Sequence, residues 1–245
     1  MTDATPDRPV IGIHQPNYFP WLGYFAKIAQ SDIFIFLDDV QFSKHGFSNR
    51  NRIKTVQGVQ WLTVPVRARL GATILQTAPA GDRWREVHLK TLRGAYGRSP
   101  HFGAVFPWVE EMLAGRQDAS LAALNIRLVT GLCRRLSLQA TLQRSSDLPV
   151  AGTGDDRLIE LVKAVRGAVY LSGRGAASYQ EPEKFRQAGL GFRYGSFQGP
   201  VYDQPWGDFV EHLSVLDALF SAGWERTREL LGVSGAVGAV SAPTT

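Results

Sequence analysis

Residues 10–39 read VIGIHQPNYFPWLGYFAKIAQSDIFIFLDD, and this stretch decides the fold class. The apolar run at 10–14 predicts a buried strand, and the two prolines that follow keep the next segment out of a regular helix. Apolar residues at near-helical spacing over 21–30 predict a helix, and the continuous apolar run at 33–37 predicts a second strand. Strand, helix and strand in this order form a βαβ unit, for which a right-handed crossover is expected.

The rest of the chain continues this alternation of short apolar runs and amphipathic helical patterns. The polar segment 41–57 is predicted to be a long loop. The pattern favours an α/β, Rossmann-like fold with a mostly parallel sheet and helices on both faces. One domain at 9–231 is expected, with a helical insert or cap at 83–136 and flexible tails at 1–8 and 232–245. Strands are predicted at 59–66, 73–77, 141–143, 168–171 and 191–194, and helices at 83–96, 102–113, 120–136, 157–166, 182–188, 208–220 and 224–231.

Composition excludes several classes of protein. With 245 residues, 44% of them hydrophobic and 20% charged, the chain can build a full core and is not globally disordered. The single cysteine, Cys133, excludes an intrachain disulfide and a cysteine-rich metal site, and its place in a leucine-striped helix marks it as a core residue. The sequence has no signal peptide and no apolar run of membrane-spanning length, so a cytoplasmic protein without a membrane partner is expected.

The net charge of +5 is unevenly distributed along the chain. Residues 1–100 hold 13 Lys and Arg against 7 Asp and Glu, a net charge of +6, whereas the remainder is close to neutral. Such an excess attracts phosphate, nucleic acid or an acidic protein, although a basic surface without a ligand has the same composition.

Three polar clusters follow predicted strands, at 14–18, 38–39 and 172–175. Since the carboxyl ends of parallel strands share one edge of a sheet, these clusters are expected to converge there and form the site. His14 is the candidate general base and Asp38 the residue that orients its imidazole; the alternative for His14 is a structural histidine bonded to backbone. Adjacent side chains on an extended chain point in opposite directions, so Asp39 is assigned separately to substrate binding, with turn formation as the alternative.

The other candidate ligands are side chains that suit sugar hydroxyls, amides or anions. The amide and hydroxyl groups can bind neutral polar substrates, the basic ones an anionic donor, and the glycine-containing turn lets backbone N–H groups approach a ligand. A solvated basic face and an ordinary turn are the alternatives. Hydrolase and zinc motifs are absent, so no metal is predicted and the cofactor stays open. The candidates are Gln15, Asn17, Tyr18, Lys44, Asn49, Arg50, Arg52, Lys54, Ser172 and Gly173.

The segments IGIHQPNYFPWLGYFAKIAQSDIFIFLDDVQFSKHGFSNRNRIKT, WLTVPV and TGDDRLIELVKAVRGAVYLSGRGAASY together resemble the WbqC-like family, over about residues 9–230. The resemblance implies a role in bacterial surface-polysaccharide or secondary-metabolite biosynthesis, with glycyl-type aminoacyl transfer to an amino sugar. The family's recurring polar residues fall on His14, Gln15, Asn17, Tyr18, Asp38, Asp39, Asn49, Arg50, Asn51, Lys54, Ser172 and Gly173.

The sequence therefore predicts an acyl or aminoacyl transferase that moves a group from a carrier-bound or otherwise activated donor to an amine. The acceptor is a small-molecule amine or a nucleotide-sugar, and the carrier is an acidic protein or a tRNA. Two alternatives stay open. The opening also resembles nucleotidyltransferases with an H-x-G-H signature, although the second histidine is missing here, which leaves an adenylating enzyme as one alternative. A non-catalytic binder of a biosynthetic intermediate is the other.

Overall fold

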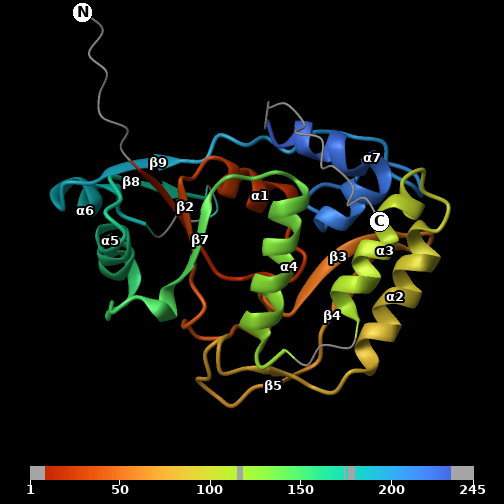
Figure 1. The fold of residues 1–245 in the computed structure, drawn as a ribbon, viewed down its shortest axis with the longest axis horizontal. Helices are drawn as coiled ribbons and strands as arrows, with labels where there is room; N and C mark the ends of the chain where they lie inside the picture. Colours follow the sequence, from red (N-terminus) through yellow and green to blue (C-terminus); the bar gives the residue numbers. More distant parts are fainter. Residues whose placement is uncertain (1–8, 115–117, 174, 176–179, 233–245) are drawn as a thin grey trace, which may run out of the picture.

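The computed structural model describes residues 9–114, 118–173, 175 and 180–232. Its centre is a five-stranded sheet in which every neighbouring pair of strands is parallel (Figure 1). The strand order is β7-β2-β1-β8-β9. The strands are β1 (Val10–His14), β2 (Ile33–Phe36), β7 (Thr141–Arg144), β8 (Val169–Ser172) and β9 (Gly191–Tyr194). The predicted α/β class and parallel sheet are confirmed.

Alternation along the strands gives the sheet two apolar faces. Ile11, Ile13 and Ile35 pack with α5 (Gly154–Ala164) and α6 (Pro182–Gln187) in one core. Phe34 and Phe36 point to the other face, where they join α1 (Leu22–Ala29) and α4 (Leu121–Arg135) in a larger core. Figure 1 shows these helix pairs on opposite sides of the sheet. The predicted cover on both faces is therefore confirmed.

A second layer extends the larger core. Helices α2 (Arg83–Tyr96) and α3 (Phe102–Leu113) follow one another in the chain, and α3 packs on α7 (Val215–Leu230). Helix α7 begins seven residues later than the helix predicted at 208–220, and its helical conformation is interrupted at Gly223 (φ 78°, ψ 176°), which agrees with the predicted break before the helix at 224–231. The predicted tails fall outside the described residues, except for residue 232.

The prediction of a loop over 41–57 is wrong in its second half. Strands β3 (Arg50–Thr55) and β4 (Gly58–Thr63) form an antiparallel hairpin there. The polar sequence of β3 concealed this strand, because the residues that it buries include Asn51 and Lys54 as well as Ile53, whereas the strand predicted at 59–66 is confirmed in β4. A two-stranded ribbon of β5 (Val66–Arg67) and β6 (Ala78–Pro79) follows; the strand predicted at 73–77 is a turn that precedes β6.

The order of the strands identifies the place where a ligand would bind. The chain adds β2 and β7 on one side of β1, then crosses to add β8 and β9 on the other side. The sheet thus has a topological switch point between β1 and β8, and open α/β sheets bind ligands beyond the carboxyl ends of the strands at this point. His14 ends β1 and Ser172 ends β8, so both lie at this edge.

Candidate functional site

A large open cleft lies at the switch point. Its volume is about 1360 Å³, and its wall includes the ends of β1 and β8, the start of α5 and one side of α1. The cleft brings together members of all three polar clusters that the sequence predicted to converge, namely His14, Gln15, Asp39, Ser172 and Gly173. The other predicted site residues do not line it.

The His14 ring has a defined tautomer. Its Nδ1 lies 3.0 Å from the Gln15 backbone oxygen, and because a carbonyl oxygen only accepts, Nδ1 must carry the proton. The other ring nitrogen, Nε2, is then left with its lone pair, in a ring that forms part of the cleft wall. Desolvation of the ring by burial, with a contribution from the positive charge of Lys27, lowers the pKa of His14 from 6.5 to about 4. His14 is therefore a neutral proton acceptor at physiological pH.

Sequence reasoning missed Lys27, the lysine whose charge acts on His14. It lies on α1, and only 7% of it is exposed because this helix is buried on nearly all sides. Lys27 Nζ donates to the Ile13 backbone oxygen at 2.6 Å and lies 5.9 Å from the centre of the Tyr170 ring. Desolvation lowers the pKa of Lys27 from 10.5 to about 7. The available signal was a single lysine within a helix that is apolar on nearly all sides.

The β8 side of the cleft carries a buried hydrogen-bonded chain. The Ser172 hydroxyl donates to the side-chain oxygen of Gln180, and the Gln180 amide donates to the Tyr170 hydroxyl at 3.0 Å. Ser172 is thus held in the wall as predicted, but its hydroxyl proton is already used. Gly173 also lines the cleft, whereas residue 174 of the same predicted turn lies outside the described residues.

Asp39 binds a residue that sequence reasoning did not assign. Its carboxylate forms an ion pair of 2.5 Å with Arg157 Nη2, from the first half of α5, and both side chains line the cleft. The two predicted carboxylates do not diverge completely, because the Ser145 hydroxyl is 2.6 Å from Asp39 Oδ1 and 3.1 Å from Asp38 Oδ1. The strand has ended at Phe36, so strict alternation no longer applies to Asp38 and Asp39.

Asp38 has partners other than His14. It is fully buried, and its carboxylate accepts hydrogen bonds from the Ser146 backbone N–H at 3.1 Å and from the Ser146 hydroxyl at 2.8 Å. No hydrogen bond joins it to His14 within the described part of the chain, where Gln15 is the partner of the His14 ring. The predicted dyad is therefore not formed. Asp38 instead ties the end of β2 to the short helical turn Ser145–Asp147 that follows β7.

Asp38→Ala is expected to lower the free energy of unfolding by about 3 kcal/mol, because hydrogen bonds to a buried charge contribute about 1.5–3 kcal/mol each and their donors would lose their partner. Chemical denaturation of both proteins measures the change. The matched control is Asp147→Ala, which removes an exposed carboxylate of the same turn and is expected to change the free energy of unfolding by less than about 0.5 kcal/mol. Equal stability of the two variants would contradict this structural role for Asp38.

Asn17, Tyr18 and Asn49 are buried outside the cleft wall. The Tyr18 hydroxyl pairs with His88 Nδ1 at 2.9 Å, while the other nitrogen of His88 donates to a backbone oxygen. The Asn49 amide donates to the Val64 backbone oxygen at 3.0 Å. For Tyr18 the structure thus corrects the prediction, because its hydroxyl is used within the fold, whereas Asn49 uses its amide nitrogen there and keeps a buried Oδ1 without a partner among the described residues. Their pattern gave no warning, since a buried hydrogen-bonded amide has the same sequence appearance as a ligand.

The basic residues of the β3 segment also lie away from the cleft wall. Lys54 is 2% exposed, and its ammonium binds backbone oxygens of Gly207, at 2.9 Å, and Asp208. The Arg50 guanidinium stacks on Trp61 at 4.2 Å, and Arg52 donates to a backbone oxygen at 3.4 Å. Lys44 is exposed. Lys54 thus holds the hairpin to the chain before α7, whereas the anion-binding role of Arg50 and Arg52 stays a prediction, at positions outside the cleft wall.

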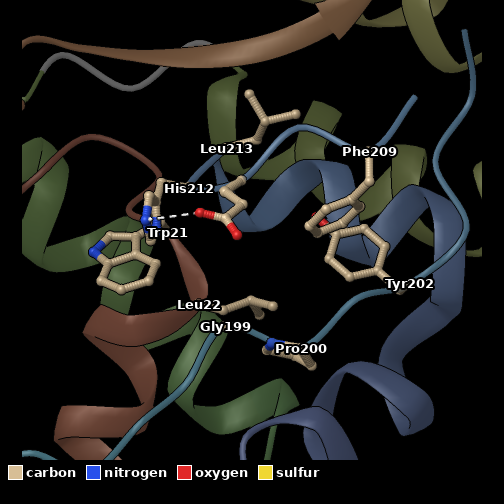
Figure 2. Close-up of a pocket in the computed structure, with 9 residues that line it drawn as sticks. Trp21, Leu22, Gly199, Pro200, Tyr202, Phe209, His212 and Leu213 are labelled. Atoms are coloured by element: carbon tan, nitrogen blue, oxygen red, sulfur yellow. Dashed lines mark ion pairs between the residues drawn. The ribbon is translucent and has the colours of Figure 1, made fainter. Parts of the chain in front are cut away.

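A small pocket of about 60 Å³ adjoins the cleft and shares Trp21 and His212 with it. Figure 2 shows Trp21 and His212 on one side of this pocket, and Phe209 and Tyr202 facing them from the other. The His212 ring lies 3.6 Å from the Glu211 carboxylate, and Tyr202 donates to the buried Asp217 at 2.8 Å. The pocket is lined by aromatic, aliphatic and charged residues together, and the chain just before α7 forms one side of it.

Two further properties concern the described residues alone. They contain no group of three or more His, Cys, Asp or Glu side chains placed to hold a metal ion. None of their helices has both the length and the hydropathy that crossing a membrane requires.

The fold and the cleft define this chain as a doubly wound α/β protein with a large cleft at its switch point. Residues 15–229 match the model of the WbqC-like protein family, and the chain belongs to that family. It is 36% identical over 218 residues to the uncharacterized protein Rv1507c of Mycobacterium tuberculosis, an alignment that covers 88% of this chain and 94% of that relative. No solved structure matches the chain significantly.

Proposed function

We propose that this protein is a biosynthetic acyl or aminoacyl transferase that uses an amine as acceptor and the cleft at the switch point as its active site. The observation that carries the proposal is His14, a neutral histidine with a fixed Nδ1–H tautomer in the wall of a cleft of about 1360 Å³. A histidine held in this way is equipped to accept a proton at Nε2 without first losing one.

The proposed reaction begins with attack of the acceptor amine nitrogen on the carbonyl carbon of an activated ester or thioester. A C–N bond forms, and the carbonyl π electrons move to oxygen, which gives a tetrahedral adduct. His14 Nε2 then takes a proton from the adduct nitrogen. When the oxyanion re-forms the carbonyl, the C–O or C–S bond breaks, and the leaving oxygen or sulfur receives that proton.

The low pKa of His14 agrees with this order of events. A base with a pKa of about 4 removes few protons from a free ammonium group, but a nitrogen already bonded to the donor carbon is far more acidic. The remaining predicted cleft residues would bind the acceptor. The Gln15 side chain offers a donor and an acceptor suited to sugar hydroxyls, and Gly173 presents backbone without a side chain in the way.

The test supplies the purified protein with a thioester of glycine on an acyl-carrier protein and with a panel of amino sugars and nucleotide amino sugars. Mass spectrometry of the products is expected to show a new amide, formed without ATP and lost in His14→Gln. Absence of amide with every donor and acceptor pair would contradict the proposal. Product formation that requires ATP and releases pyrophosphate would instead indicate an adenylating enzyme.

A further inference from the structure

Lys27 is a buried ammonium group without a carboxylate partner in the described part of the chain. It is 7% exposed, and desolvation alone accounts for the change in its pKa. The Ile13 backbone oxygen accepts one of its three N–H groups. The nearest aromatic face is Tyr170, whose centre lies 5.9 Å from Nζ. Two N–H groups of the Lys27 ammonium are therefore left to donate to a ligand in the cleft, which Lys27 helps to line.

The other charges in the described wall of the cleft have partners. Asp39 pairs with Arg157, and the exposed Lys184 with Glu181 at 2.9 Å. The remaining carboxylate, Asp155, accepts from the Glu181 backbone N–H at 2.8 Å. From β1 the neutral His14 faces the same space, from β8 Tyr170, and from α1 itself Tyr24, whose hydroxyl donates to the Gln15 backbone oxygen. None of these groups neutralises Lys27.

Burial without a counter-ion makes the lysine unfavourable for stability. Removing an ammonium from water costs several kcal/mol even after relaxation, and an apolar side chain of similar volume at this position would avoid that cost. Destabilising groups of this kind are retained where they act on a ligand. Lys27 sits one backbone carbonyl away from His14, at the switch point, which is the place where a ligand is expected.

We propose that Lys27 forms an anion subsite of the cleft and binds a ligand through an anionic oxygen, from a phosphate or a carboxylate group. Its two free N–H groups donate to that oxygen, and the ligand charge replaces the missing counter-ion. The inference rests on the proposed function, in which His14 beside this subsite acts on the same ligand. It assigns to Lys27 the role that the sequence suggested for Arg50, Arg52 and Lys54.

The test is a nuclear magnetic resonance titration of the full chain labelled with ¹³C at lysine Cε. The Lys27 signal is assigned by its loss in Lys27→Met, and Lys163, an exposed lysine on α5, serves as internal control. In a buffer without small anions, the Lys27 signal is expected to titrate near pH 7. Inorganic phosphate or acetate should raise that midpoint by about 0.5–1 pH unit, because a nearby negative charge favours the ammonium, and should leave Lys163 unchanged.

The two anions separate the two ligand chemistries. A response to phosphate alone indicates a phosphorylated ligand, and a response to acetate alone a carboxylate. A Lys27 midpoint that neither anion moves, or one that stays near 10.5, overturns the subsite. Those results leave the transferase proposal standing if amide formation still depends on His14. A Lys27 response without amide formation on any substrate would instead reject the transferase and keep the subsite.

Discussion

Replacement of His14 by alanine is expected to lower the rate of acyl transfer by about 10²–10⁴-fold, the usual contribution of a general base. The variant should fold, because within the described part of the chain the ring makes one hydrogen bond, to the neighbouring Gln15 backbone, and is half-buried. Ground-state binding of the acceptor should change little, since proton transfer occurs after binding. Single-turnover rates, with circular dichroism to confirm the fold, measure the effect.

The matched control is His45→Ala, which removes an exposed histidine that does not line the cleft and should leave the rate unchanged. A folded His14→Ala protein that keeps its rate would remove His14 from the mechanism. In the wild-type protein, protonation of His14 should lower the rate only as the pH approaches 4, because the pKa of His14 is lowered to about that value. In the double variant with Asp38→Ala and His14→Ala, the free-energy effects of the two substitutions should add, because hydrogen bonds join the two side chains to different partners.

Lys27→Met is expected to stabilise the protein while impairing anion binding. Burial lowers the pKa of Lys27 from 10.5 in the unfolded chain to about 7 in the fold. Between these values the unfolded chain binds more protons, so the free energy of unfolding rises with pH from about 7 to 10.5. Below pH 7 the lysine is charged in both states, and the fold carries the full free-energy cost of burying that charge. The substitution removes this penalty and loses one hydrogen bond, so at pH 6 a net gain of about 2–4 kcal/mol is expected.

The distinctive result is how this gain depends on pH. It should be largest below pH 7, shrink through pH 8 and 9, and vanish or reverse above pH 10.5, where the wild-type lysine becomes neutral in both states. Urea denaturation of both proteins at several pH values measures the difference. Lys163→Met, at an exposed site of α5, should show no such trend. A gain that is the same at every pH would mean that Lys27 is not held as a desolvated charge.

Local sequence pattern was sufficient to predict most of the sheet and its cover. Continuous apolar runs such as the one at 33–37 predicted buried strands, and spacing of apolar residues predicted the helices, because both signals depend on neighbours a few positions away. The polar ends of β1 and β8 could be placed at one edge from topology alone. Strand β3 was missed, because its buried polar residues hide the alternation that marks a strand, whereas its partner β4 largely coincides with the strand predicted at 59–66.

The sequence by itself determined which residues have the chemistry for a site, and the tertiary structure decided which of them share it. His14, Gln15, Asp39, Ser172 and Gly173 line the cleft, whereas Lys54 and Asn49 satisfy backbone oxygens elsewhere. Burial and partners of a polar side chain depend on elements far away in the sequence: Lys27 loses its water where its side chain meets Ile13 of β1 and Tyr170 of β8, not because of its immediate neighbours. Long-range packing therefore turned an ordinary helical lysine into the least compensated charge of the described cleft wall, and no local pattern records such packing.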